Sequence, residues 1–237
     1  MGAGYGPNIV TDGLVLNLDA ANKRSYPGSG TTWHDLTKNK VVGTLTNGPT
    51  YSSANGGSLV FDNTNDYIQI PYSDIFNFGT SDWTIEFWVK CNSLQSNDTY
   101  TALNSNITGN AYAAIRITST ATGAMYLLCS TNGSSWINIS TSAAGTLVTG
   151  IWNHIVATRS GSNFTLYVNK ISKLTYSSAS SLYNGNQVST IGALYNFSSP
   201  TDFINGNISQ VRVYKGKSLN SNEILQNFNA TKSRFNL

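Results

Sequence analysis

The chain has 237 residues, of which 40% are hydrophobic and only 11% are charged, against the roughly 25% of charged residues in average globular domains. The formal charge is +3 and no run of Lys and Arg is longer than Lys23-Arg24, which excludes an extended nucleic-acid groove, so we expect no nucleic-acid partner. Asn, Ser, Thr, Gly and Tyr replace the missing charges, a composition typical of a β-rich surface protein.

The N-terminal region and the hydropathy pattern predict a soluble protein made in a cytoplasm. No segment reaches the ~20 apolar residues of a membrane span, so we expect no membrane partner, and residues 1–7 lack the pattern of a signal peptide. Residues 1–12 are predicted to form a flexible Gly-rich arm, and residues 13–237 a single domain, because no composition break divides them.

Short alternating segments then follow one another, bounded by Gly, Asn, Ser and Pro. The predicted strands are residues 14–19, 41–45, 58–61, 67–70, 83–90, 112–118, 123–129, 136–139, 150–158, 164–169, 188–191 and 207–214. The alternation in residues 83–90 and 164–169 predicts which side chains face the core. They are Trp83, Ile85, Phe87, Val89, Phe164, Leu166 and Val168.

One helix is predicted near the C-terminus, over residues 220–228. Asn220 is placed to cap free amides, Glu223 takes the capping-box position, and Ile224, Leu225 and Phe228 form an apolar stripe. More than ten short strands and one late helix predict an all-β, two-sheet antiparallel sandwich with one short C-terminal helix.

Cysteines and histidines are too few to define a site on their own. Cys91 and Cys129 are predicted to be buried free thiols rather than a disulfide framework, although their spacing leaves a pairing open. His34 and His154 are too few for a zinc site, and His154 is interpreted as a partly buried strand residue with satisfied hydrogen bonds.

Several motifs together resemble a known family. The hairpin of residues 150–169 runs from a Trp152-x-His154 strand into a Leu-Tyr-Val-Asn strand, and the ordered motifs Trp33-x-Asp35-Leu and Phe61-Asp62-x-x-Asn-Asp66-Tyr add to it. With residues 13–20, 43–51 and 206–224, they resemble the laminin G-like group of concanavalin A-like jelly rolls, of the kind found in tailed-phage structural proteins.

The resemblance implies a jelly-roll fold and a place on the virion surface, as a decoration protein or a head or tail fibre. The expected partners are other virion proteins and further copies of this chain, forming a homo-oligomer. The alternative is a receptor-binding adhesin that recognises a cell-surface glycan. Both interpretations stay open, because the ligand is not named by the sequence.

Metal binding is expected to be absent or limited to one weakly bound Ca²⁺. Family members that bind calcium are expected to use acids near Asp62 and Asp66 and in the last strand, where this chain has Ser209. Loss of one carboxylate ligand weakens a site that needs six to eight oxygens. The alternative is that Asp62 and Asp66 only cap turns.

Catalysis is not expected, so the protein is predicted not to be an enzyme. A glycoside hydrolase needs two carboxylates roughly 5 to 10 Å apart. Glu86 is the best candidate acid, on the same face as Trp88, but Asp82 on the same strand would lie about 13 Å away at ~3.3 Å per residue.

Candidate binding residues remain. Aromatic rings that stack on sugars are predicted at Trp88, Trp136, Tyr183 and Tyr195, with Tyr112 and Tyr126 as further rings, and the alternative is that these rings serve core or subunit packing. Tyr5, Pro7 and Ile9 are predicted to anchor the N-terminal arm to neighbouring subunits.

Overall fold

The computed structural model describes residues 8–105, 113–196 and 199–237, and these build two antiparallel sheets that face each other. The first sheet runs, in spatial order, through β13 (Ile171–Ser177), β12 (Asn163–Val168), β11 (Asn153–Ser160), β7 (Trp83–Ser93), β17 (Asn205–Lys215), β5 (Ser58–Asp62) and β4 (Thr50–Ser52). A further strand, β1 (Leu14–Asp19), also pairs with β17.

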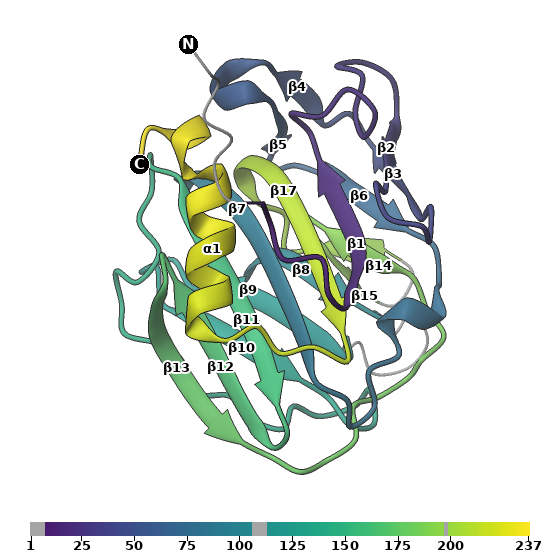
Figure 1. Ribbon diagram of the computed structural model, residues 1–237, viewed down its shortest axis with the longest axis vertical. Coiled ribbons are helices and arrows are strands. Elements are labelled where there is room, and N and C mark those ends of the chain that lie inside the picture. The colour runs from purple at the N-terminus through teal and green to yellow at the C-terminus, as the bar shows by residue number, and fades with distance from the viewer. Residues whose placement is uncertain (1–7, 106–112, 197–198) are drawn as a thin grey trace.

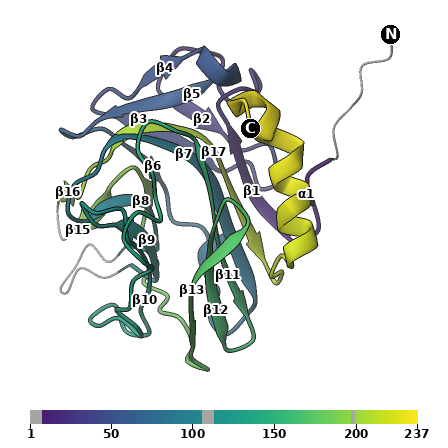
Figure 2. The ribbon, with the colours of Figure 1, turned by 90° about the vertical axis from the view of Figure 1, so that its left-hand side faces the viewer.

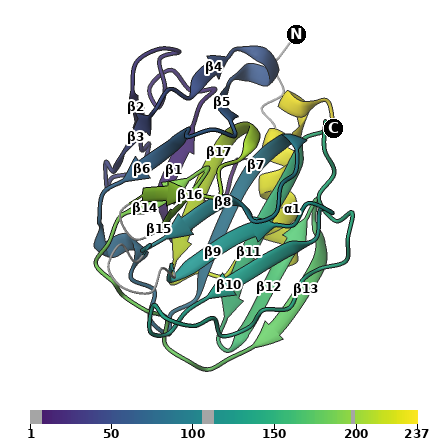
Figure 3. The same ribbon diagram turned by 180° about the vertical axis from the view of Figure 1, so that it is seen from behind.

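The second sheet runs through β10 (Met125–Cys129), β9 (Ile115–Ser119), β8 (Asp98–Leu103), β14 (Ser189–Ile191), β6 (Tyr67–Ile70), β3 (Val42–Thr46) and β2 (Thr32–His34). A small hairpin of β15 (Leu194–Asn196) and β16 (Ser199–Thr201) lies beside it (Figure 3). Helix α1 (Ser221–Thr231) covers the outer face of the first sheet, as the edge-on view in Figure 2 shows. Short 3-10 turns cover Ala54–Gly56, Asp74–Phe76 and Lys232–Phe235. The predicted all-β sandwich is confirmed.

The core lies between the two sheets, where the predicted alternation places it. All seven side chains predicted to face the core are at most 2% exposed. Strand β7 is central because β11 and β17 flank it on either side (Figure 1). Its other face is also buried, since α1 packs on Trp88 through Phe228. A period-two pattern marked the inner face, but it gave no sign that the outer face would be covered.

The predicted hairpin is present as β11 and β12. Arg159 pairs with Phe164 and Ser160 with Asn163, which leaves a two-residue loop. Gly161 in this loop has φ +58°, a left-handed conformation that costs glycine little. Asn63 has φ +65°, a left-handed conformation that Asn adopts more readily than most residues other than Gly.

The predicted capping box of the helix is confirmed. The Asn220 side chain accepts hydrogen bonds from the amides of Asn222 and Glu223, and the Glu223 carboxylate accepts one from the Asn220 amide. The stripe is narrower than predicted, because Leu225 is 42% exposed while the polar Asn227 is buried. This polar residue is inside because it has partners there.

Some elements differ from the sequence-based expectation. Residues 136–139 form no strand, and Trp136 takes part in an isolated bridge with Ser130. Strands β2, β4, β8, β13, β15 and β16 were not predicted, since they are short or rich in Thr and Ser and lack apolar alternation. Residue 112, the start of one predicted strand, lies outside the described residues.

The first described residues pack on α1, so the domain begins before the predicted boundary at residue 13. The Asn227 side chain accepts a hydrogen bond of 2.8 Å from the Val10 amide, Gln226 donates to the Asn8 carbonyl, and the Tyr214 hydroxyl donates to the Val10 carbonyl. Tyr5 and Pro7 lie outside the described residues, whereas Ile9 is half-buried against the domain.

Both cysteines are free and buried, as predicted. Burial raises the pKa of each thiol to about 12, so neither forms the reactive thiolate near neutral pH. Within the described ranges, no helix has the length and apolar character needed to cross a lipid bilayer.

Candidate functional site

The outer face of the first sheet carries a buried charged cluster beneath α1. Glu86 accepts a hydrogen bond of 2.6 Å from Arg212 and one of 3.0 Å from Asn227 of α1. Both members of the ion pair are at most 3% exposed. His154 Nε2 lies 3.4 Å from the second Glu86 oxygen, and neither ring nitrogen makes a hydrogen bond with a described residue. His154 is therefore fully buried and not satisfied in the way the sequence suggested.

This cluster also removes Glu86 from the list of candidate acids. Burial alone would raise the pKa of Glu86, but the Arg212 guanidinium and His154 outweigh that effect and hold the pKa at about 2. The carboxylate is thus an anion held beneath α1, in a residue that is 1% exposed. Its physical task is to offset the positive charge of Arg212 within the fold.

The prediction that Trp88 stacks on sugar is wrong, because its ring has no exposed surface. The ring packs between His154, Phe228 and Phe235, with centroid distances of 4.9, 5.4 and 4.3 Å. Its indole N–H donates to the Thr231 hydroxyl of α1. Trp88 therefore holds the C-terminal helix on the sheet.

The other predicted aromatic residues are partly exposed but do not form one site. Trp136 and Tyr183 lie on neighbouring segments, because Trp136 bridges to Ser130 and the Tyr183 amide donates to the Ser130 carbonyl. Tyr195 lies on the separate β15–β16 hairpin, edge-on to Tyr67 at 6.4 Å. Sugar binding by these three rings stays a prediction.

Tyr126 is half-buried on β10, and Tyr112 lies outside the described residues. The described members of the predicted aromatic set are thus dispersed over the two large sheets, the small β15–β16 hairpin and two loops.

Asp62 and Asp66 lie close together and both hold the turn after β5. Asp62 Oδ1 accepts from the Thr64 amide at 2.8 Å, and Asp66 Oδ2 accepts from the Asp62 amide at 3.2 Å. Burial, followed by the like charge of Asp62, raises the pKa of Asp66 to about 6. Among the described residues, no group of three or more His, Cys, Asp or Glu side chains is placed to hold a metal ion. The geometry fits turn caps better than a calcium cage with six to eight oxygens.

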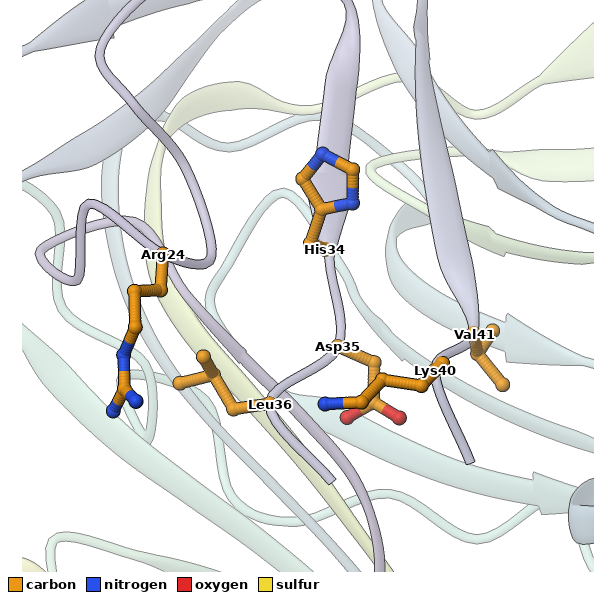
Figure 4. Close-up of a pocket in the computed structure, with 6 residues that line it drawn as sticks. All are labelled: Arg24, His34, Asp35, Leu36, Lys40 and Val41. Carbon is orange, nitrogen blue, oxygen red and sulfur yellow. The ribbon is translucent and has the colours of Figure 1, made fainter. Parts of the chain in front are cut away.

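A hollow of about 380 Å³ opens on the surface between the loop after β1 and strands β2 and β3 (Figure 4). Its lining residues are Arg24, His34, Asp35, Leu36, Lys40 and Val41. In Figure 4 Leu36 lies between Arg24 and Lys40, with the ring of His34 above them. Arg24, His34 and Lys40 are exposed. None of the three side chains makes a hydrogen bond or ion pair with a described residue.

The single acid in this hollow, Asp35, is committed to the fold. Its Oδ1 accepts from the amides of Asn17 and Thr37, and its Oδ2 accepts from the Thr37 hydroxyl at 2.6 Å. Asp35 is 4% exposed, and its bonds to Asn17 and Thr37 tie the loop to β1. The cations at the rim are therefore left without an acidic partner in the hollow.

Two further hollows adjoin this one, because Leu36 lines all three. One follows β1 and includes Lys38 and Asn17, and the other reaches Arg234 near the end of α1. Arg234 is held by both oxygens of Asp19, so its charge is offset. The three hollows together outline a groove beside β1, which we call the Leu36 groove.

Sequence reasoning missed this site because its cations are separated along the chain. Only the antiparallel pairing of β2 with β3, His34 opposite Val42, brings residues 34 and 40 to one place. A signal was nevertheless available. Residues 20–61 contain four cations, Lys23, Arg24, Lys38 and Lys40, and one acid, Asp35, so their net charge of +3 equals that of the whole chain.

The two facing antiparallel sheets, with α1 packed on the first, define a concanavalin A-like sandwich. The family model described as the concanavalin A-like lectin/glucanase superfamily matches residues 62–225, more than half of the chain. The protein therefore belongs to this superfamily. Among curated proteins, none matches the sequence significantly.

Solved structures support the same fold at low sequence identity. A Trypanosoma rangeli sialidase in complex with sialic acid is similar in structure, with a TM-score of 0.68 and 16% sequence identity. The match covers 97% of this chain and 35% of the sialidase chain. A second similar structure is domain 4 of a GH43 extracellular arabinanase from Geobacillus stearothermophilus, in complex with arabinotriose. Its TM-score is 0.63 at 19% sequence identity, and the match covers 89% of this chain and 96% of the arabinanase domain.

The binding domain of Paraclostridial Mosquitocidal Protein 1 gives a TM-score of 0.68 at 18% sequence identity, and the match covers 92% of this chain and 52% of that chain. The chain thus spans about a third of the sialidase but nearly all of the arabinanase domain. At these identities the likeness shows the fold alone.

Proposed function

We propose that this protein is a non-catalytic carbohydrate-binding module that engages its ligand at the surface of the sandwich. The observation that carries the proposal is the Leu36 groove, on a domain of the lectin/glucanase superfamily. There Arg24 and Lys40 present side-chain hydrogen-bond donors that pair with no described residue. The hollow of Arg24 and Lys40, at about 380 Å³, falls in the size range of small-ligand sites. The similar arabinanase domain, whose structure was solved in complex with arabinotriose, supports a sugar as the ligand.

The positions of the acids support binding without catalysis. The chain has two glutamates: Glu86 is buried with Arg212, and Glu223 caps α1 and pairs with Lys217 at 2.6 Å. A hydrolase needs two carboxylates flanking the scissile bond. In the described part of the chain, the Leu36 groove offers only Asp35 and Asp19, and both carboxylates are held by other groups.

Glycan-array binding of the purified protein tests this function. Binding to a defined set of glycans is expected, with no reducing sugar released from the glycans that bind. Release of sugar would contradict the non-catalytic proposal, and absence of binding across neutral and acidic glycans would contradict carbohydrate recognition.

We also propose that the module is displayed on a phage virion as a decoration or fibre protein, assembled with other virion proteins and with further copies of itself. The support is the order of opening and closing motifs described above, which resembles that of tailed-phage structural proteins. Residues 1–9 are proposed as the anchoring arm, with Tyr5, Pro7 and Ile9 as its contacts.

Deletion of residues 2–7 tests the arm, because Asn8 and Val10 are bonded to α1 and must be retained. The truncated protein is expected to fold with an unchanged melting temperature but to lose occupancy on particles that lack the protein. Full occupancy by the truncated protein would rule out anchoring through this segment, and absence of the intact protein from purified particles would rule out the virion location.

A further inference from the structure

We infer that the Leu36 groove selects acidic saccharides, whose carboxylate or sulfate groups are held by Arg24 and Lys40. This inference rests on the proposed function and specifies its ligand class. The two cations line one hollow, are exposed, and make no ion pair with any described residue.

Charge distribution supports an anionic ligand. Residues 20–61 carry the entire formal excess of the chain, +3, so the remaining residues are neutral in sum. Lys38 extends the positive charge into the adjoining hollow along β1. The hollow itself holds Arg24, Lys40 and the Asp35 carboxylate, so its formal charge is +1 with His34 neutral. A concave surface with an excess of one sign of charge raises the local concentration of oppositely charged ligands.

The chemistry of the lining fits a charged sugar better than a neutral one. Neutral sugars are recognised largely by stacking on aromatic rings. Of the six residues in the hollow of Arg24 and Lys40, His34 is the only one with a ring, and the apolar walls are Leu36 and Val41. A guanidinium instead offers two parallel N–H donors to a carboxylate or sulfate, and an ammonium adds a point charge.

The lining also favours a saccharide over a nucleic acid. Single-stranded nucleic acids are held by successive bases stacked on aromatic side chains, as well as by cations along the backbone. Among the described residues, no Phe, Tyr or Trp lines the three hollows of the Leu36 groove. Three exposed cations, Arg24, Lys38 and Lys40, suit a few anionic groups on a short stretch of glycan.

The experiment measures binding of the full chain to four immobilised probes: polygalacturonate, dextran sulfate, unmodified dextran and a single-stranded oligonucleotide. Arg24→Gln and Lys40→Gln each remove one charge from the hollow. Lys173→Gln on the exposed edge strand β13 removes one charge elsewhere and serves as the matched control.

The unsubstituted protein is expected to bind an acidic probe in a salt-sensitive manner and to bind dextran weakly or not at all. Arg24→Gln and Lys40→Gln should each lower this affinity by about tenfold, the cost of one lost charge-assisted contact. Lys173→Gln should change it by less than about twofold. The carboxylate and sulfate probes separate the two sources of negative charge.

The outcomes distinguish this inference from the proposed function. Equal losses in Lys173→Gln and Arg24→Gln would overturn the site, since they would report net charge only. Binding to neutral glycans alone would overturn acidic selectivity while leaving carbohydrate binding intact. If the protein binds the oligonucleotide more tightly than the saccharide probes, and Arg24→Gln and Lys40→Gln lose that binding, the ligand of the groove is a nucleic acid and the inference is wrong. Failure to bind any probe or any glycan on the array would overturn both the acidic selectivity and the proposed carbohydrate-binding function.

Discussion

Two groups of charged side chains contrast in this molecule. Beneath α1, Arg212 lies 2.6 Å from Glu86 and both are almost fully removed from water. Around the Leu36 groove, Arg24 and Lys40 are exposed and make no ion pair with a described residue. A buried cation must be paired because desolvation is costly, whereas an exposed cation stays hydrated until a ligand replaces its water. The first group therefore serves folding, and the second is free for binding.

Breaking the buried pair should have the largest effect on stability. Arg212→Met leaves the Glu86 carboxylate buried without its main partner, and the free energy of unfolding is expected to fall by about 3 to 5 kcal/mol. Urea unfolding measures this loss. The double substitution Arg212→Met with Glu86→Gln should recover part of it, because the unpaired charge is then absent.

The same pair has a pH signature. The pKa of Glu86 is held near 2, below its ordinary value of 4.5, so its contribution to stability is complete above about pH 4.5 and is lost as the pH falls through about 2. Arg212→Met should move acid unfolding to higher pH. An unchanged acid transition would contradict the role of this pair.

Trp88→Ala separates helix packing from sugar stacking. The ring fills the space between the first sheet and α1, so its removal is expected to cost about 3 to 5 kcal/mol of unfolding free energy. Where the variant remains folded, its glycan affinity should match that of the unsubstituted protein. A stable variant that loses glycan binding would restore Trp88 as a binding residue.

Asp66 should make a smaller contribution to the pH dependence of stability, and one that is lost as the pH rises rather than as it falls. Its folded pKa of about 6 lies above the ordinary value of 3.8, so the folded protein binds the proton more tightly than the unfolded chain. The stabilising contribution is complete below about pH 4 and is lost as the pH rises through about 6. Asp66→Asn should remove this part of the pH dependence, and the part due to Asp98, whose pKa is also about 6, should remain.

Removal of calcium tests whether the turn of Asp62 and Asp66 binds a metal ion. Because Asp62 and Asp66 each accept a backbone hydrogen bond, we expect EDTA to leave the melting temperature of calcium-saturated protein unchanged. A melting temperature that rises with calcium in the unsubstituted protein, but not in Asp66→Asn, would instead establish a metal site there.

The exposed cations should have the smallest effect on stability. Arg24→Gln and Lys40→Gln are each expected to change the unfolding free energy by no more than about 0.5 kcal/mol, since neither side chain makes a hydrogen bond or ion pair with a described residue. Their effect should appear only in ligand binding. A loss of stability comparable with that of Arg212→Met would show that these residues serve the fold.

Sequence reasoning predicted most of the fold because local patterns carry that information. Alternation in β7 and in the β11–β12 hairpin identified the core side chains, and the Asn220 and Glu223 capping box identified the start of α1. These signals depend on residues adjacent in the chain. The Thr-rich strand β8 escaped prediction, because its polar side chains become buried only once its neighbours are in place.

The candidate site was harder to predict, because its exposure depends on contacts between residues far apart in the chain. Trp88 and Glu86 were interpreted as a sugar-facing pair because they share the outer face of β7, and the helix that covers them lies more than a hundred residues away in sequence. Trp136, Tyr183 and Tyr195 could be found as aromatic residues, yet their spacing did not tell which rings lie together.

The sequence by itself determined the all-β class, the inner face of the central strands, the capped C-terminal helix and the family resemblance, since short-range periodicity and motif order are sufficient for these. The tertiary structure decided which charges are buried and which are exposed. That outcome depends on strand order and on the position of α1, which bring Arg212 to Glu86 and Arg24 to the same hollow as Lys40. Whether a charged residue supports the fold or is available to a ligand follows from these long-range contacts, because only they remove its water or provide its partner.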